Sequence, residues 1–221
     1  MTRHDKRVQA LAICLAALAG YVDAIGFIKS GGFFVSFMSG NSTRLAVGLA
    51  STAINAVVAA GLIAAFVVGV SSGSLVGHAA RSHRRPVVLL FVAALLGLGA
   101  TSPLFAPPWL TIVLMALAMG AENAVFEQGG ELGIGVTYMT GSLVKVGLGL
   151  AGMVLGRRRH EWISYLLLWL GLVIGAVAGA LTYHWLDIDA LYVASGLAAM
   201  LALVAALIRT PADSSASASN A

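Results

Sequence analysis

Two long runs without formal charge constrain this chain more than any other feature. No Asp, Glu, Lys or Arg occurs in Ser51–Ala80 or in Pro86–Ala121. A helix that crosses a bilayer needs roughly 20 mostly apolar residues. The first run is long enough for one crossing and the second for two, with prolines at 103 and 107–108 marking a turn between them. The runs therefore predict an all-α polytopic membrane protein.

The composition agrees with a chain whose main partner is the lipid bilayer. Hydrophobic residues make up 59% of the chain and charged residues 10%, whereas soluble domains carry about 25% charged residues. The net charge of +4 does not indicate a nucleic-acid partner, because the cations gather in short clusters beside apolar segments, at 3–7, 81–85 and 157–160. Such clusters are typical of the cytoplasmic loops of membrane proteins.

Both ends of the chain are predicted to lie outside the membrane part. Residues 1–7 form a cytoplasmic N-terminal segment, and residues 209–221 a disordered C-terminal tail with too little apolar surface to fold. The apolar stretch after residue 7 also imitates a cleavable signal peptide, ending in Ala-Leu-Ala. The same tripeptide recurs at 116–118, deep inside the chain, which favours a retained first span over cleavage.

A short motif occurs twice, 101 residues apart. "MSGNSTR" (box 1, residues 38–44) is matched by "MTGSLVK" (box 2, residues 139–145), and each ends in a cation. Upstream, "GYVDA" faces "GAENA" at an offset of 100, and a ladder of three glycines recurs downstream at an offset of 102. Nearly constant offsets at three places indicate an internal duplication, with halves at 8–106 and 108–208.

Each half contains four apolar segments: 9–28, 33–50, 54–79 and 86–105, then 108–127, 134–154, 161–185 and 189–208. Eight full crossings from a cytoplasmic N-terminus would leave the cluster at 81–85 outside, against the positive-inside rule. When the two box segments enter and leave on one face, every basic cluster lies inside. We therefore predict six transmembrane helices plus two re-entrant half-helix segments, as an inverted internal repeat with both termini cytoplasmic. This plan is common in secondary transporters.

The boxes suit a turn inside the membrane. Non-helical backbone is tolerated at that depth only where it is buried in protein or lines an aqueous cavity. Glycines at 31–32 and 129–130 would loosen the entry, Gly40 and Gly141 would lie at the reversal, and the box hydroxyls and amide would cap the half-helices. Two opposed helix N-termini would then form a midplane site for a small polar solute, anions included. The predicted substrate-binding residues are Ser39, Gly40, Asn41, Ser42, Arg44, Thr140, Gly141, Ser142 and Lys145.

The cations of the boxes allow a second interpretation. Asp23 lies on the first span, and Glu122 on its repeat partner, where Asn123 aligns with Asp23. A charge at the bilayer centre costs about 3 kcal/mol or more, so pairing is expected in any case. Pairs of Asp23 with Arg44 and of Glu122 with Lys145 could be purely structural, or could open to gate the site or relay a proton.

The glycine ladders predict close helix packing. Gly-xxx-Gly spacing lets a neighbouring backbone approach, and packing within the chain is the default, with a homo-oligomer face as the alternative. The ladders are Gly69, Gly73 and Gly77 in the first half and Gly171, Gly175 and Gly179 in the second.

Three segments resemble a known family. "GYVDAIGF", "FVSFMSGNSTRLA" and "TYMTGSLVK" are similar to the signature segments of the YoaK-like bacterial integral membrane proteins, a domain of unknown function, over about residues 8–208. The resemblance implies a bacterial cytoplasmic-membrane protein with about six spans and supplies no substrate. Ser142 stands where box 1 has Asn41, so we expect two unequal half-sites.

The favoured function is a transporter or channel for a small polar solute. The short predicted loops favour it over the alternative, a non-transporting scaffold that binds a partner. An intramembrane enzyme is less favoured, because no nucleophile and base are placed together among the buried residues. We predict no enzyme activity, no metal, because the histidines lack ligand spacing, and no cofactor.

Overall fold

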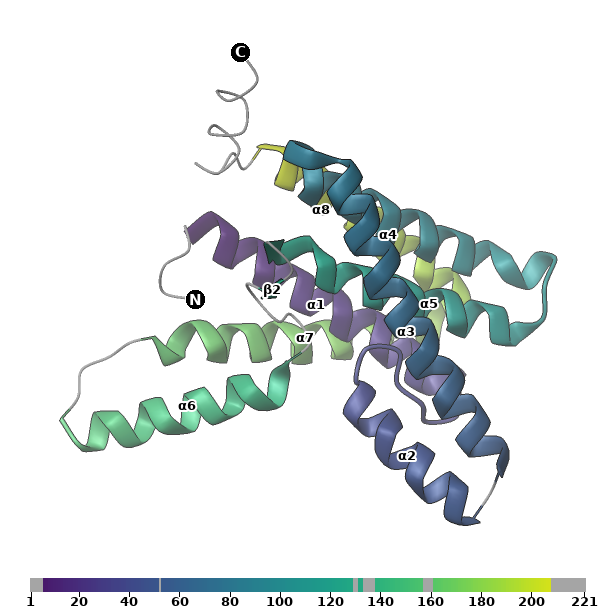
Figure 1. Ribbon diagram of the computed structural model, residues 1–221, viewed down its shortest axis with the longest axis horizontal. Helices are drawn as coiled ribbons and strands as arrows, with labels where there is room; N and C mark the ends of the chain where they lie inside the picture. The colour runs from purple at the N-terminus through teal and green to yellow at the C-terminus, as the bar shows by residue number, and fades with distance from the viewer. Residues whose placement is uncertain (1–5, 52, 129–130, 133–137, 157–160, 208–221) are drawn as a thin grey trace.

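The structure, a computed structural model, describes residues 6–51, 53–128, 131–132, 138–156 and 161–207. It is almost entirely helical (Figure 1). The eight α-helices of the described part are α1 Lys6–Lys29, α2 Met38–Ser51, α3 Ala53–Ala79, α4 Arg84–Thr101, α5 Pro108–Asn123, α6 Met139–Val154, α7 Trp162–Leu186 and α8 Ala190–Leu207. Single 3-10 turns lie at η1 Arg81–His83, η2 Ser102–Leu104, η3 Ala124–Phe126 and η4 Asp187–Asp189. Two short antiparallel strands, β1 Glu127–Gln128 and β2 Glu131–Leu132, are the departure from an all-α chain.

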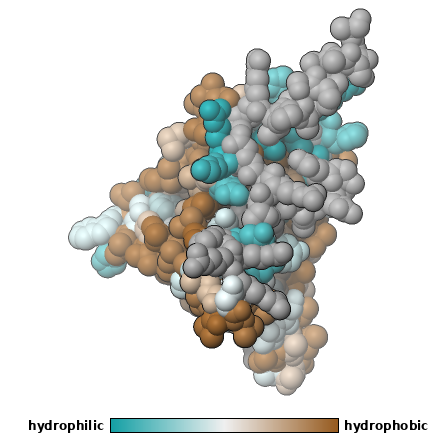
Figure 2. Space-filling view, turned by 90° about the vertical axis from the view of Figure 1, so that its left-hand side faces the viewer, coloured by the Kyte–Doolittle hydropathy of each residue, from teal (hydrophilic) through white to brown (hydrophobic). Residues whose placement is uncertain are grey.

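Five helical stretches of the described chain are long and apolar enough to cross a membrane: Lys6–Lys29, Ala53–Ala79, Arg84–Leu104, Pro108–Phe126 and Trp162–Leu207. The last stretch has 46 residues and contains both α7 and α8, with Asp187 at a positive φ of 50° between them. Apolar side chains cover broad areas of the face in Figure 2, as lipid contact requires. The prediction of a helical, polytopic membrane protein is thus confirmed, with five stretches that are long and apolar enough to cross a membrane among the described residues.

The first helix of one half packs along the third helix of the other. Glycines of α7 lie against the backbone of α1, in the order Gly171 with Ile13, Gly175 with Ala17 and Gly179 with Tyr21. The residue numbers increase in the same direction along both helices, so α1 and α7 run parallel. A methyl group on Gly175 would collide with the carbonyl of Ala17, so this ladder works as small-residue helix packing within the chain.

The matching contact joins α3 and α5. Gly69 lies against Leu117 and Gly73 against Ala121, so these helices also run parallel, while Gly77 meets the side chain of Arg84. All six ladder glycines are buried inside the chain. The prediction of close packing is confirmed, and these glycines offer no free face to a second copy, so a homo-oligomer would need another surface.

The fourth helices of the two halves pack in opposite directions. The Ser195 hydroxyl of α8 donates to the Ala93 carbonyl of α4 at 2.8 Å, and Leu191 lies near Gly99. Higher numbers on one helix therefore meet lower numbers on the other. Within the pair α4 and α5, Gly99 lies near Leu114 at one end, and Arg84 reaches Ala124 at the other, so these two are antiparallel as well.

These contacts sort six of the helices into two sets of three that run in opposite directions. The Tyr21 hydroxyl, near the end of α1, donates to the carbonyl of Ala190, the first residue of α8, at 3.1 Å, and the two helices pack together. Hence α1, α4 and α7 run one way, and α3, α5 and α8 the other. The short helices α2 and α6 each connect two helices of opposite direction (Figure 1).

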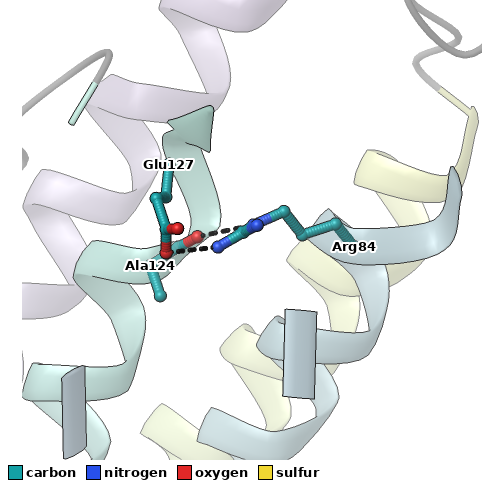
Figure 3. Close-up of polar contacts among 3 residues, drawn as sticks. All are labelled: Arg84, Ala124 and Glu127. Atoms are coloured by element: carbon teal, nitrogen blue, oxygen red, sulfur yellow. Dashed lines mark hydrogen bonds and ion pairs between the residues drawn. The ribbon is translucent and has the colours of Figure 1, made fainter. Parts of the chain in front are cut away.

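The end of α5 is anchored to the start of α4 (Figure 3). The Arg84 guanidinium donates to the Ala124 carbonyl at 3.1 Å and pairs with the Glu127 carboxylate at 2.5 Å. A cation that bonds a carbonyl at a helix C-terminus complements the helix dipole. Arg85 lies with its guanidinium carbon 5.9 Å from the centre of the Phe126 ring. Two neighbouring arginines therefore hold the α5–η3 end in place.

The chain reverses earlier than the boxes. Gly31 and Gly32, at φ of 72° and 107°, end α1 and begin the return, a conformation that glycine adopts without a Cβ penalty. The expected reversal at Gly40 and Gly141 is wrong, because both lie in the first turn of a helix. The glycines at 129–130 and the predicted tail at 209–221 lie outside the described residues.

Candidate functional site

The starts of α2 and α6 line one cavity of about 560 Å³. Both helices begin near the middle of the molecule and run outward in different directions (Figure 1). The cavity is lined by Ser36, Phe37, Met38, Ser39, Phe66, Val70, Asn123, Tyr138, Met139, Thr140 and Gly141. The structure thus brings the two boxes, a hundred residues apart in sequence, to the same place.

The chemistry of the lining is polar without formal charge. Hydroxyl groups come from Ser36, Ser39, Tyr138 and Thr140, and an amide comes from Asn123. The remaining lining side chains are aromatic or aliphatic. Pockets for small ligands typically measure about 300–1,000 Å³ and combine an apolar wall with a few polar groups. The cavity fits that description.

Asp23 holds the loop that leads to box 1. One of its carboxylate oxygens accepts the backbone N–H groups of Val35 and Ser36, each at 2.8 Å. A carboxylate that accepts two amides fixes the local backbone strongly, because charge-assisted hydrogen bonds are among the stronger ones. Asp23 therefore places Ser36 at the cavity without lining the cavity itself.

Asn41 closes the same loop from the other side. Its side chain is fully buried; its amide oxygen accepts the Phe34 N–H at 3.0 Å, and its amide nitrogen donates to the Phe34 carbonyl at 2.6 Å. The ring of Phe34 packs edge-on against Phe37, with centroids 5.3 Å apart, and Phe37 lines the cavity. Asn41 thus acts on the cavity wall by holding the loop.

The box hydroxyls do not cap their helices in the predicted way. Ser42 donates to the Met38 carbonyl at 2.9 Å and Ser142 to the Tyr138 carbonyl at 3.3 Å, four residues back in each case. Tyr138, the N-cap residue of α6, makes no side-chain capping bond. Because α2 and α6 start at the methionines, Ser42 and Ser142 already lie within the helices and not at their N-cap positions.

The two box glycines have different surroundings. A Cβ on Gly40 would lie 2.7 Å from the Phe37 ring and 2.9 Å from the Phe34 ring, whereas nothing described lies within 4 Å of one on Gly141. Gly141 lines the cavity and Gly40 does not. The expectation of two unequal half-sites agrees with this difference.

Both cations lie away from the cavity wall. The guanidinium carbon of Arg44 lies 5.0 Å from the centre of the Phe33 ring. The Lys145 ammonium donates to the Tyr165 hydroxyl at 3.1 Å and lies 4.3 Å from that ring's centre. Such cation–π contacts satisfy a charge without an acid.

The two ion pairs considered in the second interpretation, Asp23 with Arg44 and Glu122 with Lys145, are not formed among the described residues. Asp23 accepts backbone amides in place of Arg44. Glu122 is fully buried, and its two carboxyl oxygens have no hydrogen-bond partner in the described part of the chain. The Asn123 amide donates to the Met119 carbonyl at 2.9 Å.

Seven lining residues lay outside the predicted set: Ser36, Phe37, Met38, Tyr138 and Met139, in or directly before the boxes, and Phe66 and Val70, on α3. Ser36 and Phe37 directly precede box 1, and Tyr138 directly precedes box 2; extending each motif toward its N-terminus would have included them. Phe66 carried no polar signal. It reaches the wall because its backbone packs against Gly120, next to the cavity-lining end of α5.

Known proteins resemble this chain along most of its length. The sequence model of a family described as "Protein of unknown function (DUF1275)" matches residues 11–204. "UPF0700 transmembrane protein RA0705" of Rhizobium meliloti (strain 1021) is 40% identical over 203 residues, which cover 91% of this chain and 87% of that protein. "UPF0700 transmembrane protein YoaK" of Bacillus subtilis (strain 168) is 25% identical over 194 residues, covering 79% and 84%. No solved structure matches this chain.

Proposed function

Because the chain belongs to the family described as "Protein of unknown function (DUF1275)", with relatives named as transmembrane proteins, we propose that it moves a small polar solute across a bacterial cytoplasmic membrane. The solute binds in the cavity between the two boxes. The supporting observation is the shared cavity itself, lined from both halves by the first turns of α2 and α6. A scaffold has no need of such a cavity.

The proposed topology has six spans, two re-entrant helices and cytoplasmic termini. At about 1.5 Å per residue, the 14 residues of α2 reach about 21 Å and the 16 residues of α6 about 24 Å. Both lengths fall short of a hydrocarbon core of about 30 Å. The opposite directions of α1 and α3, and of α5 and α7, support the same topology, because a full crossing between them would make each pair parallel.

The lining favours a neutral or weakly anionic solute over a cation. Helix N-termini present unsatisfied N–H groups and partial positive charge, and α6 lacks a side-chain cap. The hydroxyls of Ser39 and Thr140 supply donors and acceptors from opposite halves. Arg44 and Lys145, held by aromatic rings, contribute positive potential at a distance instead of direct contact.

Uptake into proteoliposomes tests the proposal. Purified protein is reconstituted, and uptake is measured over a panel of labelled neutral metabolites and small anions. A Ser39→Leu/Thr140→Leu variant replaces one cavity hydroxyl from each half with a larger apolar side chain, and we expect it to lose about tenfold in flux, or about 1.4 kcal/mol. The matched control is Thr43→Leu, on an exposed position of α2, which should keep the wild-type flux.

Two results would remove the proposal. In the first, every compound enters wild-type vesicles no faster than protein-free vesicles. In the second, the Ser39→Leu/Thr140→Leu variant transports as fast as the wild type. Both proteins must be folded, as judged by helical circular dichroism and a single peak in size-exclusion chromatography.

A further inference from the structure

Glu122 is a buried acid with no structural explanation. It lies in the last turn of α5, its side chain is 0% exposed, and neither carboxyl oxygen has a hydrogen-bond partner among the described residues. The neighbouring acids differ: Glu127 pairs with Arg84 (Figure 3), and Asp23 accepts two backbone amides. A carboxyl group buried without a partner costs free energy, so it is a place to look for function.

The helices around α5 offer no counter-charge to Glu122. The charged or titratable side chains on the helices that pack against α5 are Lys6, Arg7, Cys14, Tyr21, Asp23 and Lys29 on α1, His78 on α3, and Arg84 and Arg85 on α4. Arg84 is bound to Glu127 and to Ala124, Asp23 is bound to amides, and His78 lies in the last turn of α3. An isolated carboxylate that is buried without a hydrogen-bond partner is expensive, so a proton is the ligand that satisfies Glu122.

Glu122 lies on the part of α5 that also contributes to the cavity wall. The next residue, Asn123, lines the cavity, and Gly120 packs against Phe66 and Val70, which also line it. Met115, Met119 and Glu122 follow the spacing of one helix stripe. Met115 meets Gly26 of α1, so this stripe faces α1 while the adjoining face of α5 forms the cavity wall.

We propose that Glu122 is the proton-binding site that couples solute movement to the proton gradient, and this rests on the transport function proposed above. Because α5 carries both Glu122 and part of the cavity wall, movement of α5 relative to α1 changes the cavity. The same movement changes the packing that seals Glu122 from water. Water reaches the carboxyl group when that seal opens. The proton then leaves or binds reversibly, and no other bond forms or breaks.

Infrared spectroscopy tests the proton site without knowledge of the solute. Acidic buffer also protonates exposed carboxylates, so the band to follow is the higher-frequency carbonyl stretch of a protonated carboxylic acid that has no hydrogen-bond partner. We expect it in difference spectra of the reconstituted protein between acidic and alkaline buffer. We expect Glu122→Gln to remove that band and Glu122→Asp to restore a shifted one. Asp189→Asn, which changes an exposed acid, should leave it. A band that survives in Glu122→Gln overturns the proposal, as does its absence from the wild type.

Gradient-driven uptake tests the coupling. The probe is whichever panel compound wild-type vesicles take up. One pH unit, acid outside, supports about tenfold accumulation at one proton per solute, equivalent to about 1.4 kcal/mol. Glu122→Gln should exchange labelled for unlabelled compound at the wild-type rate and yet accumulate none against its gradient. Equal accumulation by wild type and Glu122→Gln would refute the coupling and leave the transport function intact. A wild-type protein that moves no compound would refute both transport and coupling. The infrared experiment would then decide the proton site by itself.

Discussion

At the scale of single residues, equivalent positions in the two boxes do different work. Asn41 is buried and holds a loop with two hydrogen bonds to Phe34. The Ser142 hydroxyl, by contrast, donates to the carbonyl of Tyr138, the N-cap residue of its own helix. Two copies of one motif have therefore diverged, with box 1 supported by its own loop.

This asymmetry predicts that truncating the two side chains to alanine lowers the free energy of unfolding by different amounts. Asn41→Ala leaves the Phe34 N–H and carbonyl without partners, and we expect it to lower the free energy of unfolding by about 1–3 kcal/mol. Ser142→Ala is the matched control and should change it by less than about 0.5 kcal/mol. Thermal unfolding in detergent, followed by circular dichroism, gives both values. Equal losses in the two variants would contradict the assignment of Asn41 as a loop clamp.

The charged residues of the site were the part least predictable from sequence. Spacing identified Asp23, Glu122, Arg44 and Lys145 as the charged residues on or beside the box segments, but which partner each one meets depends on distances of a few ångströms. Asp23 lies closer to two backbone amides than to a cation, and each box cation rests on an aromatic ring instead. Sequence patterns carry no information about such choices.

At the scale of helices, small residues decide which elements meet. Glycine spacing predicted close packing, and α3 shows how position within one helix matters. A Cβ at Gly69 would run into the Leu117 backbone, whereas at Gly61 nothing described lies within 4 Å.

We therefore expect opposite effects from one substitution made twice in α3. Gly69→Ala separates α3 from α5 and should destabilise the protein by about 1–3 kcal/mol, as overpacking does. Gly61→Ala should be neutral or stabilising by up to about 1 kcal/mol, since alanine is the better helix former. Midpoints of thermal unfolding in the same detergent compare them, and a Gly69→Ala protein as stable as Gly61→Ala would show that the contact is not close.

The order of apolar segments was the most predictable feature. All eight predicted segments contain a helix, because runs of apolar residues and clusters of cations leave few alternatives in a membrane. The start of α2 was missed by five residues: the segment was expected from 33, and the helix begins at Met38. The bonds of Asp23 and Asn41 keep residues 33–37 out of helical geometry, and an apolar pattern does not reveal such bonds between side chains and backbone.

At the scale of the whole molecule, topology follows from the direction of α2. We predict that Ser30 and Ser51, at either end of the box 1 segment, face the same side of the membrane. In a Cys14→Ala background, Ser30→Cys and Ser51→Cys should both react with a membrane-impermeant maleimide applied outside intact cells. A cysteine at exposed Leu155, beyond α6, should react only after the cells are opened. Labelling of Ser30→Cys without Ser51→Cys would mean that α2 crosses completely.

The pairing of α1 with α7 and of α3 with α5 has a consequence for any shortened version of the chain. In each half, the glycine face of the third helix has no partner within that half, because the helix that packs against it belongs to the other half. A polypeptide holding residues 1–107 alone would need a sister molecule inserted upside down in the same bilayer. Co-expression of the two halves as separate chains should therefore recover a stable complex, while either fragment alone is degraded.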